Sequence, residues 1–302
     1  MPYKNLSEKR QYDKRYWLKI KGEGPAPISA AYNLAQGLVK DLGIPVPKHG
    51  LKIATLTDAQ VMPGVRMEHL GWYGEYVAEK KPDAIVCIGD MGDFPSLSQF
   101  GRGTRDFAMH RYSNDIAAFH QGMQLFMGPI DAEIERTAKT DKPWRPYREF
   151  CEGNHESHLD RITQEYAFLE GTISKDDLCL ADYGWRVHPF MQPIAIGGVA
   201  FCHYFPSGVM GRPITSAQAL LRKLHMSAFA GHQQGRDIAY GRRADGAHMT
   251  AIISGSFYQH DYKYLSPFTN RHWRGTYFLH EVKDGQFDEM ALSIGFLKRR
   301  CG

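Results

Sequence analysis

The sequence predicts an α/β fold for residues 51–302, and three patterns support this prediction. Short apolar runs alternate with segments of helical periodicity from Leu51 onward. Five of the apolar runs end within three residues of an Asp, Asn or His residue that follows them. Near the end of the chain the sequence becomes strand-rich, with the turn Lys283-Asp284-Gly285 between two strand candidates. We therefore expect an α/β domain whose second half contains more strands.

The expected elements follow one another in a regular order. Apolar residues at a period of two, or in short continuous runs, indicate strands, whereas a period of 3.6 indicates helices. On this basis we expect strands at residues 51–57, 84–88, 147–151, 194–203, 227–231, 249–254, 275–282 and 287–294. We expect helices at 66–80, within 113–139, at 156–169 and at 214–224. Residues 94–145 form a long insertion, which is either a lid or specificity element or a peripheral helical elaboration.

The first 50 residues differ from the rest of the chain. Residues 1–22 contain seven Lys and Arg and two acidic residues, so seven minus two gives +5, and the remainder carries −1 of the total charge of +4. Tyr and Trp residues interleave with these charges, a composition that can follow a phosphate backbone and stack on bases. The alternative is a solvated arm or a docked helix. Residues 23–50 are expected to form a linker and one helix, at 29–42, that ends near Gly43.

Composition indicates a soluble protein. A chain of 302 residues with 43% hydrophobic residues can fill a core, and no apolar run approaches the roughly 20 residues of a membrane span. The chain opens without a signal segment, and its five cysteines are odd in number and show no Cys-x-x-Cys spacing. We therefore expect a cytoplasmic protein with no membrane partner.

The polar residues that follow the apolar runs point to a metal site. Carboxylate, amide oxygen and imidazole are ligands of Mn²⁺, Fe and Zn²⁺. One such residue after a strand is usually a turn residue or a core histidine, but five in order are hard to explain in that way. They stand at Asp58, in Gly89-Asp90-Met91-Gly92-Asp93, in Gly153-Asn154-His155-Glu156, at His203 and at His232.

In this order the motifs resemble those of the calcineurin-like metallophosphoesterases. The resemblance spans residues 51 to about 297 and includes the strand and Gly-Ser turn of Ile252-Ile253-Ser254-Gly255-Ser256. It implies a four-layer α-β-β-α sandwich of two mixed sheets and a metal-dependent hydrolase of phosphoesters. The opening segment and the stretch around Gly231–Asp237 further resemble phage-encoded members, which would place the protein in the host cytoplasm.

The resemblance implies two unequal metal sites. One would keep the family's full ligand set, which here is Asp90, Asn154, His203 and His232. The other would share Asp90 with it and add Asp58, but the two histidines of the family are glutamines here, Gln60 and Gln234. Carboxylate and amide oxygens form a harder ligand set than one with imidazole nitrogen. This site therefore either binds a harder ion such as Mn²⁺ or Mg²⁺ more weakly, or has lost its metal. We expect two ions, with Mn²⁺ favoured over Fe, Zn²⁺ or Mg²⁺.

The resemblance also implies catalytic roles. A metal-bound water would attack the phosphorus, and His155 would donate a proton to the leaving alkoxide. Asp93 would accept a hydrogen bond from the His155 ring, unless it is only a turn residue. Arg161 and Arg236 are candidates for holding the free phosphate oxygens, and their alternative role is that of surface ion-pair partners.

Three kinds of function remain open on the sequence. The first is a phosphodiesterase that acts on nucleic acid or a nucleotide, which the basic arm favours. The second is a phosphomonoesterase that acts on a protein or a small molecule. The third is a catalytically weak module that binds nucleic acid or a partner protein.

Overall fold

Two mixed six-stranded sheets form the centre of the protein. The computed structural model describes residues 39–99, 105–262 and 269–302. The first sheet has the order β14(Gln286–Ser293), β13(Gly275–Lys283), β2(Leu51–Leu56), β3(Ala84–Cys87), β4(Tyr147–Cys151) and β5(Arg186–His188). The second has the order β1(Lys40–Asp41), β6(Ile194–Ile196), β7(Val199–Cys202), β10(Ala228–Ala230), β12(His248–Ser254) and β11(Arg236–Arg242). The predicted α/β class and the two mixed sheets are confirmed.

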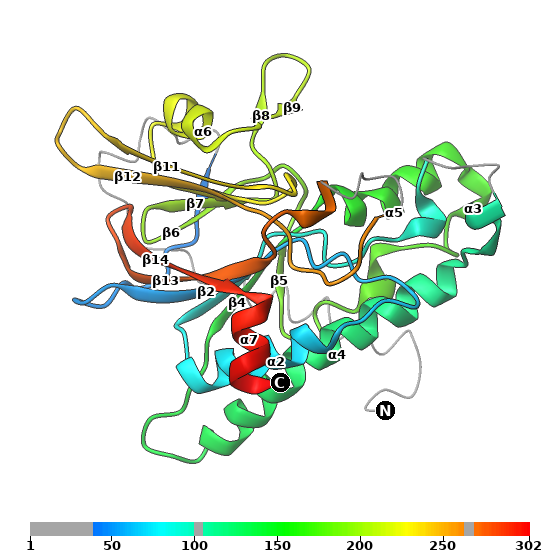
Figure 1. Ribbon diagram of the computed structural model, residues 1–302, viewed down its shortest axis with the longest axis horizontal. Coiled ribbons are helices and arrows are strands. Elements are labelled where there is room, and N and C mark those ends of the chain that lie inside the picture. The colour runs from blue at the N-terminus through cyan, green and yellow to red at the C-terminus, as the bar shows by residue number, and fades with distance from the viewer. Residues whose placement is uncertain (1–38, 100–104, 263–268) are drawn as a thin grey trace.

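The two sheets pack face to face, as Figure 1 shows. Alternate residues of each strand point to opposite faces, so Ile53 of β2 lies in the core between the sheets and Ala54 lies on the outer face. From the other sheet, Phe201 and Phe229 enter the same core, with ring centroids 5.9 Å apart. The contact buries apolar side chains of both sheets and fixes their relative position.

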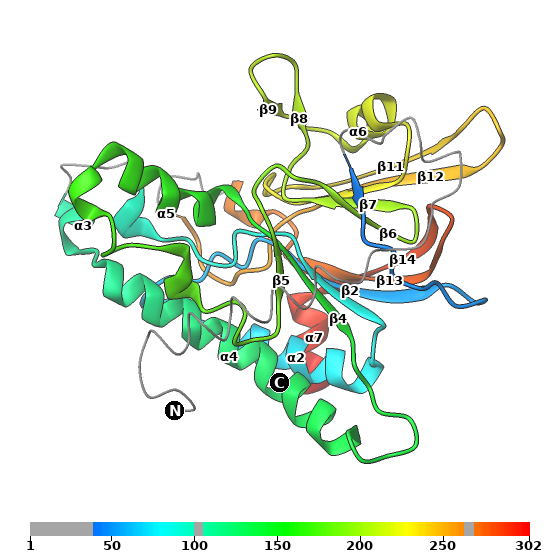
Figure 2. The same ribbon diagram turned by 180° about the vertical axis from the view of Figure 1, so that it is seen from behind.

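Helices cover the outer faces of both sheets, as the view from behind also shows (Figure 2). Helices α2(Glu68–Lys80), α4(Tyr112–Thr137) and α7(Ile294–Cys301) pack on the first sheet. Helix α6(Ala217–Leu224) packs on the second. Helix α5(Asn154–Glu165) begins where β4 ends. The remaining elements are α3(Arg105–Met109), the hairpin strands β8(Pro206–Ser207) and β9(Arg212–Pro213), and the 3₁₀ turns η2(Pro95–Leu97), η3(Ala167–Leu169), η4(Lys175–Leu178) and η5(Thr269–Arg271).

Part of the predicted insertion at residues 94–145 belongs to the core. Helix α4 buries Phe119, Met123, Phe126 and Ile130 in the cluster beneath the first sheet. The ring of Phe126 stacks on that of Tyr73 in α2, with centroids 5.5 Å apart. The helix is thus neither a lid nor a peripheral addition. Across the described ranges, no helix combines the length and the apolar character needed to cross a bilayer.

Two sequence predictions of secondary structure need correction. The strand expected at 194–203 is two antiparallel strands, because Gly197 and Gly198 adopt positive φ angles of 56° and 85° and turn the chain. The helix expected at 29–42 lies mostly outside the described residues, and at its end Lys40–Asp41 form a strand that pairs with β6. The basic arm, residues 1–22, lies wholly outside them. Strands β5 and β11 and helix α7 were not predicted.

Candidate metal centre

The predicted ligands lie at one end of the two sheets. Strands β2, β3 and β4 are parallel neighbours, so their carboxyl ends meet at one edge. Strands β7 and β10 are parallel neighbours in the second sheet and end at the same side of the molecule. Contacts between the sheets close the site, because the N–H of His232 donates to both carboxylate oxygens of Asp58, at 3.0 and 3.2 Å. Nδ1 of His203 donates to the carbonyl of Ile88 at 2.9 Å.

Four side-chain atoms converge on a single position. Oδ1 of Asn154 lies 2.9 Å from Nε2 of His203 and 2.8 Å from Nδ1 of His232. Oδ2 of Asp90 lies 3.3 Å from Nε2 of His203. Ligands about 2.1 Å from one ion, at angles between octahedral and tetrahedral, lie about 3.0–3.4 Å apart. The spacing therefore fits one divalent cation, and Asp90, His203 and His232 form a possible metal-binding group.

The orientations of the His203 ring and of the Asp90 carboxylate support this assignment. A carbonyl only accepts hydrogen bonds, so Nδ1 of His203 carries the proton that it donates to Ile88. In the neutral ring the lone pair is then on Nε2, the atom that faces Asn154 and Asp90. Oδ1 of Asp90 accepts the backbone N–H of His155 at 2.9 Å, which leaves Oδ2 toward the centre.

Two glycines let the carboxylates come close to the neighbouring segments. A Cβ atom on Gly153 would lie 2.1 Å from Oδ1 of Asp90, and one on Gly231 would lie 2.2 Å from Oδ2 of Asp58. Both contacts are far shorter than van der Waals distance, and the nearest atom in each case belongs to a buried side chain. The glycines of the Gly-Asn-His-Glu and Gly-His motifs are thus required by the geometry of the site.

The residues of the predicted weaker site are less closely assembled. Asp58 is fully buried, and Gln60 is nearly so. Oε1 of Gln60 accepts a hydrogen bond from the hydroxyl of Tyr262 at 2.8 Å. Oε1 of Gln234 is buried and has no hydrogen-bond partner among the described residues, so it retains an oxygen that a cation could use. The sequence analysis did not identify Tyr262, and no motif marks it.

Burial and neighbouring charges shift the pKa values of three groups at the centre. Burial, aided by the neighbouring Asp90, raises the pKa of Asp58 to about 8. Burial alone would raise the pKa of Asp90 too, but His203 and His155 outweigh it and hold that pKa below its usual value. Burial would lower the pKa of His203, and Asp90 instead raises it to about 9. A divalent cation would supply positive charge to both carboxylates and compete with the proton on His203.

His155 lies beside these ligands in the first turn of α5. Its Nδ1 lies 2.6 Å from the main-chain carbonyl of Asp93 and 3.3 Å from the carboxylate Oδ1 of the same residue. The predicted contact with the Asp93 carboxylate is present, but the shorter hydrogen bond is to the carbonyl. Nε2 of His155 lies 3.7 Å from Oδ2 of Asp90, so the ring faces the centre without joining the four converging atoms.

Glu156 organises the loops around the centre, a role that sequence analysis missed. Its buried carboxylate accepts backbone N–H groups of Asp90, Met91, Gly92 and Gly153, at 2.8, 2.9, 3.4 and 2.9 Å. It thereby joins the loop after β3 to the start of α5. The sequence does contain a signal for this role. Glu156 is the last residue of Gly-Asn-His-Glu, and a Glu three residues after a helix N-cap commonly accepts a hydrogen bond from the N-cap N–H.

We expect Glu156→Gln to lower the free energy of unfolding by about 2–4 kcal/mol. The amide would direct an NH₂ group at buried N–H donors, and each unsatisfied buried donor costs about 1–3 kcal/mol. Urea unfolding in the presence of a chelator would measure the loss apart from any metal effect. Glu165→Gln, on the exposed end of the same helix, is the matched control and should change stability by less than about 0.5 kcal/mol. Equal urea midpoints for the two variants would contradict this role.

The two predicted phosphate-binding arginines do not contact the converging ligands. Nε of Arg161 lies 3.5 Å from Oε1 of Glu165 in the next turn of α5. Arg236 lies over the ring of Trp273, with the guanidinium carbon 4.8 Å from the ring centroid. Both arginines have protein partners, and their role toward a phosphate stays a prediction.

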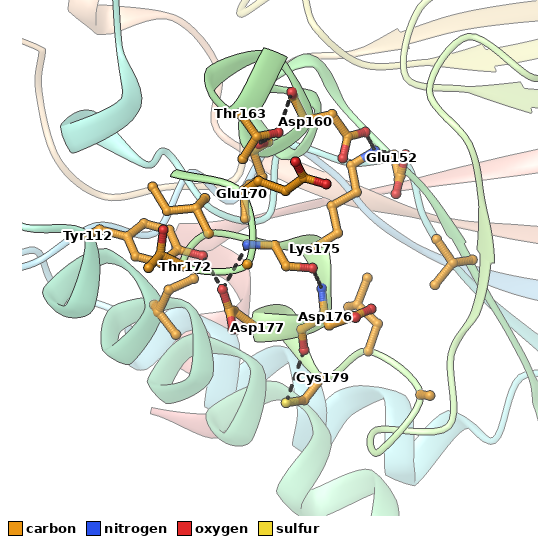
Figure 3. A pocket seen from close by; sticks show the side chains of 18 of the residues that line it. Tyr112, Glu152, Asp160, Thr163, Glu170, Thr172, Lys175, Asp176, Asp177 and Cys179 are labelled. Atoms are coloured by element: carbon orange, nitrogen blue, oxygen red, sulfur yellow. Dashed lines mark hydrogen bonds and ion pairs between the residues drawn. The ribbon is translucent and has the colours of Figure 1, made fainter. Parts of the chain in front are cut away.

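A large pocket of about 1190 Å³ lies apart from the centre. It is lined by α5, η4 and the start of α4, and none of the predicted site residues lines it. Figure 3 shows Lys175 in this pocket among acidic side chains, where it pairs with Glu152 and Asp160. The pocket is therefore separate from the four converging ligand atoms.

Comparisons with known proteins add little to this geometry. The sequence matches no protein-family profile and no curated protein. One crystal structure aligns with 80% of this chain and 99% of its own chain, at 11% identity and a TM-score of 0.38. A likeness at that level supports no statement about function.

Proposed function

We propose that this protein is a metal-dependent phosphoester hydrolase of the calcineurin-like metallophosphoesterase type. One observation carries the proposal. Four ligand atoms lie around one position, and they belong to residues that follow four separate strands: Asp90, Asn154, His203 and His232. In this proposal the two sheets and their covering helices correspond to the four-layer sandwich of that family.

Two ions fit the proposal better than one. The four converging atoms would hold the tighter ion, and Asp90 would be shared with a second. Asp58, Gln60 and Gln234 would complete the second, weaker site through oxygen atoms, a set that suits Mn²⁺ or Mg²⁺. The buried, unpartnered Oε1 of Gln234 supports this role. The hydrogen bond from Tyr262 to Oε1 of Gln60 leaves one lone pair of that oxygen for a metal.

In this proposal the bound ions and the protein's own residues have separate roles in the reaction. Bound divalent ions would activate a water as nucleophile and neutralise charge on the phosphate oxygens. His155 would donate the proton that the leaving alkoxide needs. Burial would lower the pKa of His155, but Asp90 and Asp93 outweigh it and raise that pKa, which favours the proton-carrying form. The Asp93 carbonyl accepts a hydrogen bond from Nδ1–H of His155, so Nε2 faces the centre.

The proposal is tested by metal content and turnover measured together. Purified protein should bind Mn²⁺ and hydrolyse bis(p-nitrophenyl) phosphate, a diester, faster than p-nitrophenyl phosphate, a monoester. Preference for the monoester would favour a phosphomonoesterase. Metal binding without turnover of either ester would favour the catalytically weak binding module.

The basic arm makes nucleic acid the favoured substrate class. Deleting residues 1–22 removes a charge of +5 and none of the ligands. We expect the truncated protein to hydrolyse the small diester at the same rate but to bind oligonucleotides more weakly, with a flatter dependence on salt. Fluorescence anisotropy with labelled single- and double-stranded oligonucleotides over a salt series would measure this. Identical affinities at low salt would mean that the arm does not bind nucleic acid.

A further inference from the structure

Two aromatic side chains lie against the candidate metal centre and have no part in the mechanism above. The ring of Tyr204 lies 4.9 Å from that of His232 and 6.0 Å from that of His203, measured between centroids. The ring of Phe190 lies 5.3 Å from that of Tyr204 and 6.4 Å from that of His203. Both side chains are partly exposed to solvent. We call Phe190 and Tyr204 the aromatic platform.

The platform is attached directly to the segments that supply the ligands. Tyr204 follows His203 in the chain, at the end of β7. Its hydroxyl donates to Sδ of Met191 at 3.4 Å, so the two segments of the platform are tied together. The polar end of Tyr204 therefore has a partner within the protein, and the rest of the side chain is apolar ring.

Phe190 is held from the other side. Its N–H donates to Oε2 of Glu152 at 3.2 Å, and the N–H of Glu152 donates to the carbonyl of His188 at 3.0 Å. Only Gly153 separates Glu152 from the ligand Asn154. Hydrogen bonds and chain connections therefore link both platform residues to the segments that carry the ligands.

We propose that the aromatic platform binds the planar ring of an aromatic phosphoester, either a nucleobase or an aryl group. The inference rests on the proposed function, since the phosphate of that ester would lie at the metal centre. If a phosphate binds beside His232, a substituent on it would lie near Tyr204, because the rings of His232 and Tyr204 are in contact. Stacking on an aromatic side chain tolerates any planar ring, because every ring has a π face. Phe190 widens the surface beyond the area of one ring.

Matched ligand pairs test the platform. AMP and ribose 5-phosphate differ only in the base, and phosphotyrosine and phosphoserine differ in the aryl ring. Calorimetric titration of Mn²⁺-loaded protein should show roughly tenfold tighter binding of the ring-bearing member of at least one pair. The pair that shows the difference identifies the source of the ring. In Tyr204→Leu this ratio should fall to about one, whereas Tyr204→Phe should retain it.

Two controls test whether an effect of Tyr204→Leu comes from loss of the platform and not from misfolding or a damaged metal centre. Phe168→Leu removes an exposed aromatic ring beyond the end of α5 and should keep the wild-type ratio. Inorganic phosphate should bind wild type and Tyr204→Leu alike, which would show that the centre is intact. A ratio of one for both pairs in wild type, or a ratio that survives Tyr204→Leu, would overturn the proposal.

A further measurement distinguishes failure of the platform from failure of the proposed function. Adenosine carries the ring without a phosphate, so its binding does not require the metal. Saturation-transfer NMR should detect its contact with wild-type protein and not with Tyr204→Leu. If no phosphoester is hydrolysed but this contact and the tighter binding of a ring-bearing ligand are present, the proposed hydrolase is wrong and the ring site stands. If hydrolysis is present and both the adenosine contact and the ligand ratios fail, only the platform is wrong.

Discussion

His203→Ala is expected to remove the tightly bound metal ion and to reduce turnover to background. Its Nε2 lies 2.9 Å from Oδ1 of Asn154 and 3.3 Å from Oδ2 of Asp90, so the change deletes the atom common to these contacts. Asn154→Ala should have the same effect on metal content, and its side chain is less buried, which makes misfolding less of a concern. Elemental analysis of protein dialysed against Mn²⁺ and then against buffer would measure both losses.

Gln60→Ala should behave differently. Gln60 belongs to the weaker predicted site and shares its oxygen with Tyr262, so the variant should keep the tight ion and lose affinity only for the exchangeable one. His248→Ala, an exposed histidine at the start of β12, is the matched control and should bind metal as the wild type does. Equal loss of all metal in His203→Ala, Asn154→Ala and Gln60→Ala would contradict two unequal sites. A wild-type protein that binds no Mn²⁺ would refute the centre altogether.

His155→Asn is expected to slow hydrolysis of an unactivated alkyl phosphodiester by roughly 10²- to 10⁴-fold. The effect comes from loss of the proton that the leaving alkoxide needs. A p-nitrophenolate leaving group needs no proton, so hydrolysis of an aryl diester should slow much less. Metal content should stay at the wild-type value, because the His155 ring is not among the converging ligand atoms. Rates on both esters and bound metal would be measured for the same preparation.

Asp93→Asn should give a milder form of the same defect, and the geometry explains why. The shorter hydrogen bond of His155 Nδ1, at 2.6 Å, is to the Asp93 carbonyl, which the substitution keeps. What is lost is the carboxylate charge 3.3 Å from the ring, which helps to hold the proton on His155. Equal slowing of both esters by His155→Asn, together with loss of metal, would show that His155 is a ligand and not an acid.

Much of the secondary structure could be predicted because it depends on local patterns. Strands 51–56 and 84–87 are largely apolar runs, and they and strand 147–151 match the prediction within a residue. The errors have local causes as well. Strand β11 lies at the edge of its sheet and is mostly polar, so it lacks the apolar signal of a buried strand. Helix α7 follows a strand without an intervening loop, where Ser293 caps it by accepting the N–H of Phe296 at 3.1 Å.

For the site, the sequence by itself determined which side chains follow the strand ends. Parallel strands in one sheet end on the same side, so motifs far apart in the chain were bound to lie near one another. The resemblance to the calcineurin-like metallophosphoesterases implied that Asp90, Asn154, His203 and His232 share one ion, and the strand-end pattern had marked all four without any knowledge of distances. It also marked Asp58, whose carboxylate accepts the N–H of His232.

Only the tertiary structure decided how these groups are held. Gln60 and Tyr262 lie 202 positions apart in the chain, and their hydrogen bond depends on how the loops beyond the two sheets pack. The same holds for the carboxylate of Glu156, which takes donors from the loop after β3, and for the carbonyl of Asp93, which directs His155. Main-chain atoms carry no residue signature, and contacts across such separations depend on sheet register and packing. A one-dimensional pattern therefore locates the ligands but not the groups that orient them.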